Sequence, residues 1–159
     1  MVSWATLRAL QPELAHAGSA LLYQHGVGLA FMATTRNDGG PRVHPVCPLL
    51  NDRGMFAFVI PSPKQDDLHR DGRCALHSFP TAENEDAFYV RGRARPVEDD
   101  DLRRELGRQF VDERAGQRVP APGLADHLFE FEVEACQLTR TRCHGDPDPV
   151  HQIWRAPPD

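Results

Sequence analysis

Residues 27–60 read VGLAFMATTRNDGGPRVHPVCPLLNDRGMFAFVI, and this stretch decides the fold. Apolar, strand-like segments alternate in it with turn signals, in the order 27–35, Asn37–Pro41, 42–50, Asn51–Gly54 and 55–60. Tight turns join antiparallel strands, whereas parallel strands need a long crossover. The stretch therefore predicts an antiparallel sheet and excludes a doubly wound fold. Pro45 and Pro48 require an edge position or bulges in the middle strand.

The flanking sequence adds helices and further strands. Apolar periodicity predicts two short helices within residues 1–25 and one helix each over residues 62–72 and 98–110. Further strands are expected over residues 73–79, 87–97, 129–142 and 150–154. We expect one mainly β domain over residues 1–159, in which an antiparallel sheet closes into a small barrel with flanking helices. Residues 156–159 are expected to form a tail.

Composition and charge limit the classes of function and partner that we expect. The formal net charge is −5, which favours neither nucleic acid nor an anionic membrane surface. No apolar run reaches transmembrane length, and no signal peptide is recognisable. The four cysteines show no disulfide or metal-ligand spacing, and the neighbours Cys143 and His144 point in different directions. We expect reduced thiols, no metal site and a cytoplasmic location.

The chain contains a single lysine, Lys64, among 18 Lys and Arg residues. It lies in the segment Ile60–Lys64, where a strand gives way to a helix. Arginine has a wide planar head, so a site that needs a compact positive charge does not accept it freely in place of lysine. A hydroxyl at a helix N-terminus beside lysine favours anion binding. The alternative is a surface lysine retained by chance, and this residue alone leaves both interpretations open.

Other polar groups have simpler explanations. The carboxylate clusters at Asp66–Asp67 and Asp99–Asp101 lie in predicted first turns of helices, where the helix dipole favours negative charge. The side chains of residues 91, 93 and 95, all arginine, alternate along a strand and are expected to form a solvated face, with substrate-phosphate binding as the alternative. His77 lies in an apolar segment and is interpreted as a core residue. No GxGxxG, Walker, HExxH or GxSxG motif is present.

The order of features from residue 33 to residue 76 resembles the pyridoxamine 5′-phosphate oxidase-like family of flavin-binding split barrels. The features are Ala33–Thr35, Asp38–Pro41, Arg42–Val46, Gly54–Phe58, Ser62–Lys64 and Asp67–Leu76. The resemblance implies a six-stranded antiparallel split β-barrel that forms a homodimer, with FMN in a cleft shared by the two protomers.

The resemblance also implies site residues. The second strand would line the flavin through Arg42, Val43, His44, Pro45 and Val46. The flavin phosphate would be held by Ile60, Ser62 and Lys64. Relatives often have arginine directly before this lysine; Pro63 replaces it here, so Arg42 is expected to compensate. Trp154, with Arg155, would lie over the flavin of the partner protomer, although core or interface packing explains Trp154 equally well.

We therefore expect an FMN-dependent oxidoreductase that moves a hydride between a nicotinamide or small organic substrate and the flavin. One alternative is an F420-dependent reductase, for which the three arginines at 91, 93 and 95 would form a basic groove, although the net charge argues mildly against it. The others are a non-catalytic flavin-binding protein and a barrel without cofactor. True oxidases of the family carry an Arg-x-His pair; Arg142–His144 has this spelling but is interpreted as coincidence.

Overall fold

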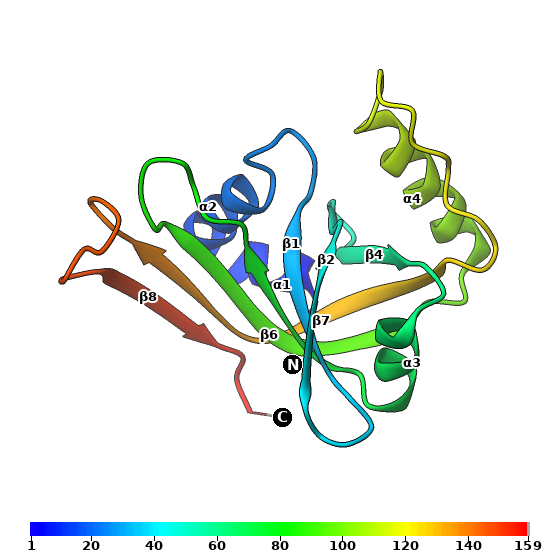
Figure 1. The fold of residues 1–159 in the computed structure, drawn as a ribbon, viewed down its shortest axis with the longest axis horizontal. Coiled ribbons are helices and arrows are strands. Elements are labelled where there is room, and N and C mark those ends of the chain that lie inside the picture. The colour runs from blue at the N-terminus through cyan, green and yellow to red at the C-terminus, as the bar shows by residue number, and fades with distance from the viewer. Residues whose placement is uncertain (159) are drawn as a thin grey trace.

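The computed structural model describes residues 1–158 (Figure 1). Its elements are α1 (Trp4–Leu10), α2 (Pro12–Leu22), β1 (Ala30–Thr35), β2 (Pro41–Val46), β3 (Leu49–Leu50), β4 (Met55–Val59), α3 (Pro63–Arg70), β5 (Arg73–Ser78), β6 (Ala87–Pro96), α4 (Asp100–Asp112), β7 (His127–Arg140) and β8 (Val150–Arg155). Within the described residues, no helix is long and apolar enough to cross a lipid bilayer.

All eight strands form one curled antiparallel sheet, which confirms the predicted mainly β split-barrel fold. The strand order is β2-β1-β5-β6-β7-β4-β3, and β8 pairs with the far end of β7. The sheet has eight strands rather than the six that the resemblance implied. One reason is that the predicted strand 42–50 is interrupted at Cys47 and Pro48, which separates β2 from β3. The sheet remains open between β2 and the β3–β4 hairpin.

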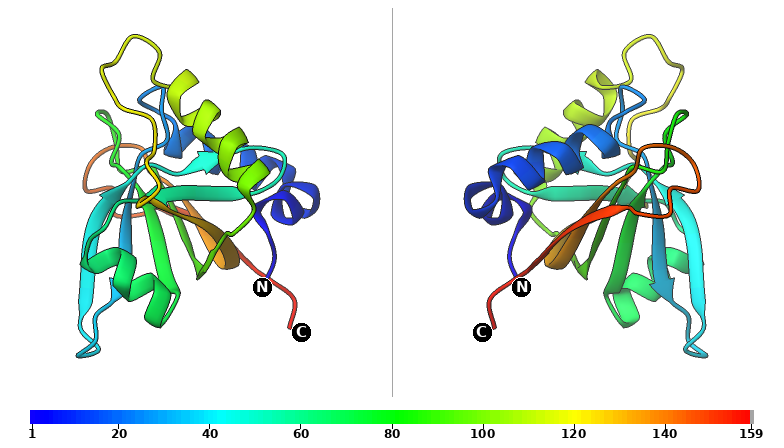
Figure 2. Two further views of the ribbon diagram at one scale, coloured as in Figure 1. Left: turned by 90° about the vertical axis from the view of Figure 1, so that its right-hand side faces the viewer. Right: turned by 90° about the vertical axis from the view of Figure 1, so that its left-hand side faces the viewer.

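Helices α1 and α2 cover the concave, inner face of the sheet (Figures 1 and 2). Trp4, Leu7 and Leu14 from these helices pack with strand residues such as Met32 and Phe88 in the main core. Contact is close where α2 crosses β6, because a Cβ at Gly18 would lie 2.6 Å from the Phe88 ring. The two predicted N-terminal helices therefore close one side of the barrel.

Gly92 marks an irregularity in the pairing of β6 with β7. The register shifts between Arg91 and Gly92, which is typical of a β-bulge. A Cβ on Gly92 would lie 1.8 Å from the backbone oxygen of Glu132, so only glycine fits here. β7 also pairs with β4 through its first residues and with β8 through its last ones.

The outer face of the sheet carries a row of neighbouring side chains that no helix of residues 1–158 buries. The pairing registers place the row across six strands, in the order Pro45, Phe31, His77, Tyr89, Gln137 and Ile153. Each of these side chains is exposed or half-buried, and Phe31 stacks on Phe79 with ring centroids 4.1 Å apart. The interpretation of His77 as a core residue is wrong, because its strand position directs it to this outer face. We call this row the outer-face row.

Candidate functional site

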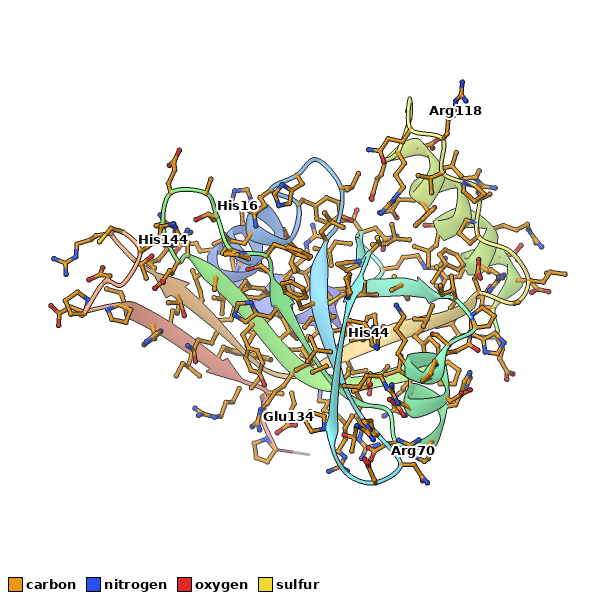
Figure 3. All side chains as sticks on the ribbon, in the orientation of Figure 1. His16, His44, Arg70, Arg118, Glu134 and His144 are labelled. Carbon is orange, nitrogen blue, oxygen red and sulfur yellow. The ribbon has the colours of Figure 1, made fainter. Side chains whose placement is uncertain are left out.

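The opening of the sheet brings the predicted phosphate-binding residues next to β2. Helix α3 lies along this opening, and its Lys64 Nζ donates a hydrogen bond to the backbone oxygen of Pro45, at 3.1 Å. Figure 3 shows His44 on β2 in the middle of the molecule and Arg70 at the lower end of α3. Lys64 and the second strand, which are separated in sequence by a hairpin and a strand, are therefore neighbours in space.

The local sequence sets the start of α3. Ser62 is the N-cap residue with extended backbone, and Pro63 occupies the first turn, where its missing N–H is not needed. The Ser62 hydroxyl does not cap the helix; it donates to the backbone oxygen of Ile60, at 2.7 Å. The first-turn N–H groups of α3 therefore receive no hydrogen bond acceptor from the Ser62 side chain.

Lys64 lies in an unusual electrostatic environment. Partial burial lowers the pKa of its ammonium group below the ordinary value, and the nearby Cys47 thiol opposes this effect. Most arginines pair with a carboxylate, as Arg91 does with Glu134 and Arg140 with Asp86. Within residues 1–158, Lys64 forms no ion pair with a carboxylate, and its hydrogen bond partner is a neutral carbonyl. A desolvated cation without a counter-charge is a favourable place for an anion.

Asp67 is buried directly behind this region, with 3% of its surface exposed. Its carboxylate accepts hydrogen bonds from Thr34 Oγ1 at 2.8 Å, Arg42 Nε at 2.7 Å and Arg70 Nη2 at 3.1 Å. Burial by itself raises the pKa of Asp67, but these three donors outweigh it and hold the pKa below its ordinary value. The helix-dipole explanation of Asp67 is therefore incomplete, because the residue links α3 to β1 and β2.

The remaining predicted residues lie on β2 or directly after β4, and their side chains differ in exposure. The side chains of Val43, His44 and Pro45 are exposed, whereas Val46 is buried in the core and offers only backbone groups. Val43 and Ile60 are each 58% exposed, which is high for large aliphatic side chains. The structure thus presents both apolar surface and positive charge around the opening.

Trp154 is not brought to the opening of its own chain. It lies on β8, which pairs with β7, while β2 is at the other end of the strand order. Its side chain packs against the main core, on the same side of the sheet as its pairing partner Cys136. The packing alternative for Trp154 therefore describes its position in one protomer, and contact with a partner's flavin stays a prediction.

The arginines for which the sequence suggested no binding role form local contacts in the structure. The arginines on β6 form the expected exposed face: Arg91 pairs with Glu134, Arg95 with Glu132, and Arg93 donates to the Asp71 backbone oxygen. Arg142 pairs with Asp146 within the turn before β8. This contact agrees with the interpretation of the Arg-x-His spelling as coincidence.

Sequence reasoning missed Asp67 and Thr34 as parts of the site. One signal was available, since Asp67 follows Lys64 by three residues and so lies on the same face of a helix. Thr34 gave no signal, because its contact with Asp67 joins residues that are 33 positions apart.

Comparisons with known proteins agree with the fold. The model of a family described as pyridoxamine 5′-phosphate oxidase matches residues 22–140. Among curated proteins, none matches the chain.

Several solved structures share the fold at low sequence identity. A haem-binding protein from Mycobacterium smegmatis is 17% identical with a TM-score of 0.65, over 87% of this chain and 57% of that one. A candidate pyridoxamine 5′-phosphate oxidase from Listeria innocua is 14% identical with a TM-score of 0.58, over 76% and 93% of the two chains. HutZ, a haem storage protein from Vibrio cholerae, is 14% identical with a TM-score of 0.56, over 79% and 90%.

Proposed function

Because this chain belongs to the pyridoxamine 5′-phosphate oxidase family, we propose that it is an FMN-dependent oxidoreductase. In this proposal the flavin lies at the opening between β2 and α3. The reaction moves a hydride between a nicotinamide or a small organic substrate and the flavin ring. When bound, FMN supplies the hydride chemistry itself, so the protein has to bind, orient and shield it.

The observation that carries the proposal is the state of Lys64. Its ammonium group is partly buried, has a lowered pKa and has no carboxylate partner within residues 1–158. A phosphate would supply the missing negative charge, and the positive end of the α3 helix dipole lies next to it. The residues at the opening therefore fit the phosphate end of FMN.

The edge of β2 fits the flavin ring. The Pro45 carbonyl accepts the hydrogen bond from Lys64, so this carbonyl is directed to the open edge. Alternate residues of an antiparallel strand direct both backbone groups to the same edge, so the N–H and C=O of Val43 also face the open edge. Val43 and Ile60 add exposed apolar surface that a planar ring would cover. In this arrangement β2 orients the ring through its main chain.

The outer-face row supports a homodimer as part of the proposal. Phe31, which is 36% exposed, lies beside Pro45 in this row, and Val43 lies beside it on the same face. A second copy of this chain packed on the row would bury these side chains and would bring its own residues close to β2. A shared cleft formed in this way would exclude water from one side of the flavin.

The arginines on β6 favour FMN over F420. A long polyanionic tail needs uncompensated positive charge, but Arg91 and Arg95 each pair with a glutamate. Neutralised arginines attract a polyanion weakly, so the basic groove expected for F420 has lost most of its charge.

Absorption spectroscopy of the purified protein tests the proposal. We expect flavin bands after addition of FMN, and we expect these bands to bleach with NADH or NADPH. Flavin bands that persist with every reductant would indicate a non-catalytic flavin-binding protein. A protein that takes up haem or F420 but not FMN would overturn the assignment of the cofactor.

The variant Lys64→Ala tests the phosphate anchor. We expect FMN binding to weaken by about 2 kcal/mol, or roughly 30-fold in Kd, because a charged hydrogen bond is lost. Riboflavin lacks the phosphate, so its affinity should stay the same. Arg104→Ala removes an exposed positive charge on α4 and serves as the control. Equal FMN affinity in Lys64→Ala and the parent protein would refute the role of Lys64.

A further inference from the structure

We propose that Asp67 is a positioning residue that holds Arg42 as a second cationic anchor for the flavin phosphate. The inference rests on the proposed function and deepens it. The Asp67 carboxylate is buried, and its donors come from three elements: Thr34 on β1, Arg42 on β2 and Arg70 on α3. Such a carboxylate fixes the position of each donor, because leaving any of them unpaired in a buried place is costly.

The way in which Arg42 is held leaves its anion-binding end free. Asp67 Oδ2 takes the Nε–H at 2.7 Å, and within residues 1–158 no hydrogen bond engages either of the two Nη groups. The Arg42 side chain is 26% exposed, so these groups are accessible to a ligand. The planar guanidinium has five donors in a fixed fork, and fixing Nε therefore sets the direction of the remaining four.

Arg42 also lies close to Pro63, a position in the sequence that supplies no hydrogen bond donor. It lines a cavity of about 420 Å³ together with Pro63, Asp66, Asp67 and Arg70. Pro63 precedes Lys64 and supplies neither a side-chain nor a backbone donor. Arg42 thus comes from β2 to the cavity that Pro63 lines, and Asp67 keeps it in place.

A purely structural role for Asp67 is the competing explanation. Asp67 joins α3 to β2, so its loss could weaken every ligand of the opening by disturbing the fold. The two roles differ in one measurable respect. A positioning role toward the phosphate predicts a loss that is specific for FMN, whereas a structural role predicts equal losses for FMN and riboflavin.

The experiment compares Kd values for FMN and riboflavin, measured by quenching of flavin fluorescence. We expect Asp67→Asn to weaken FMN binding by about 10-fold and to leave riboflavin binding unchanged, because the amide holds Arg42 without charge. Asp100→Asn makes the same chemical change at an exposed aspartate on α4, which does not line this cavity, and should change neither value. Equal losses for both ligands, or no loss for FMN, would overturn the proposal.

Arg42→Lys provides a second variant if Asp67→Asn does not fold. Lysine keeps the positive charge but has a single ammonium nitrogen. It cannot bond Asp67 and a phosphate in the fixed geometry of the planar guanidinium. We expect the same selective loss of FMN affinity, and no further loss when Asp67→Asn is added. An Arg42→Lys variant with parental FMN affinity would overturn the proposal. Failure of the proposed function looks different, because the parent protein would then bind FMN no better than riboflavin and Lys64→Ala would change nothing.

Discussion

Lys64 and Asp67 lie three residues apart on α3 and have opposite electrostatic situations. Asp67 has three donors and is fully compensated, whereas Lys64 bonds a neutral carbonyl. Rarity in the sequence was sufficient to single out Lys64. Asp67 could not be recognised in the same way, because aspartate near the start of a helix is common and its burial depends on residues far away in the sequence.

The charge on Asp67 should make the stability of the protein depend on acid pH. Hydrogen bonds lower its pKa in the folded state, whereas an unfolded aspartate has a pKa of about 3.9. The stabilisation is therefore fully present above pH ~4 and is lost as the pH falls through the lower pKa of the folded state. We expect Asp67→Asn to reduce the free energy of unfolding at pH 7 and to flatten its decrease on acidification, as measured by urea unfolding.

Asp100→Asn is again the matched control, because this carboxylate on α4 is exposed and far from α3 in the sequence. It should follow the parent protein over the whole pH range. An Asp67→Asn curve that runs parallel to the parent curve from pH 7 to strongly acidic pH would contradict the assigned stabilisation.

At the scale of elements, the sequence predicted the helices and strands well but not all of their limits. The first strand begins at Ala30 rather than Val27, because Leu29 N–H bonds the backbone oxygen of Leu22 at the end of α2. A Cβ on Gly28 would lie 1.8 Å from the Pro48 oxygen, so the chain passes close to the interruption between β2 and β3. Both contacts are long-range and leave no local pattern.

Helix α4 shows how the N-cap residue determines where a helix begins. It was predicted over residues 98–110 and spans Asp100–Asp112. Asp99 is the N-cap, and its side chain accepts a hydrogen bond from the Leu102 N–H at 2.9 Å. Three consecutive aspartates made the choice of the capping residue ambiguous in the sequence.

Two glycines in different elements should respond in opposite directions to alanine. Gly92→Ala forces a methyl group onto the Glu132 backbone oxygen, and we expect it to lower the free energy of unfolding by roughly 3 kcal/mol. Gly107 lies within α4 with nothing within 4 Å of a new Cβ, so Gly107→Ala should raise it by about 1 kcal/mol. Thermal and urea unfolding measure both effects. A Gly92→Ala protein as stable as Gly107→Ala would show that the bulge tolerates a side chain.

At the scale of the whole molecule, the candidate site depends on the curl of the sheet. Thr34, Arg42 and Asp67 meet because the open edge of the barrel is filled by α3. The sequence predicted the barrel and two sides of the site separately. It did not predict their junction, since nothing in a local pattern gives the distance between a helix and a strand edge.

The outer-face row predicts a dimer that can be broken at Phe31. We expect Phe31→Glu to raise the dimer dissociation constant by at least about 100-fold, because an unpaired charge would be buried at the centre of the interface. FMN should be released along with the monomers. Sedimentation velocity combined with flavin absorbance measures both.

Val111→Glu is the control, since Val111 is an exposed aliphatic residue on α4, outside the row. It should leave the dimer and the flavin in place. A stable Phe31→Glu monomer that retains its flavin would refute a cleft shared by two protomers.

The bond between Lys64 and Pro45 has a consequence for how readily a nucleotide is captured. An ammonium group has three protons, and the Pro45 carbonyl engages one of them. The other two remain available while the first holds the ammonium group at the edge of β2. The Lys64 side chain is thus already oriented before a nucleotide binds. Binding therefore costs little side-chain entropy, and the hydrogen bond between Lys64 and Pro45 does not have to break. Rapid, tight uptake at low nucleotide concentration is the expected signature of such preorganisation.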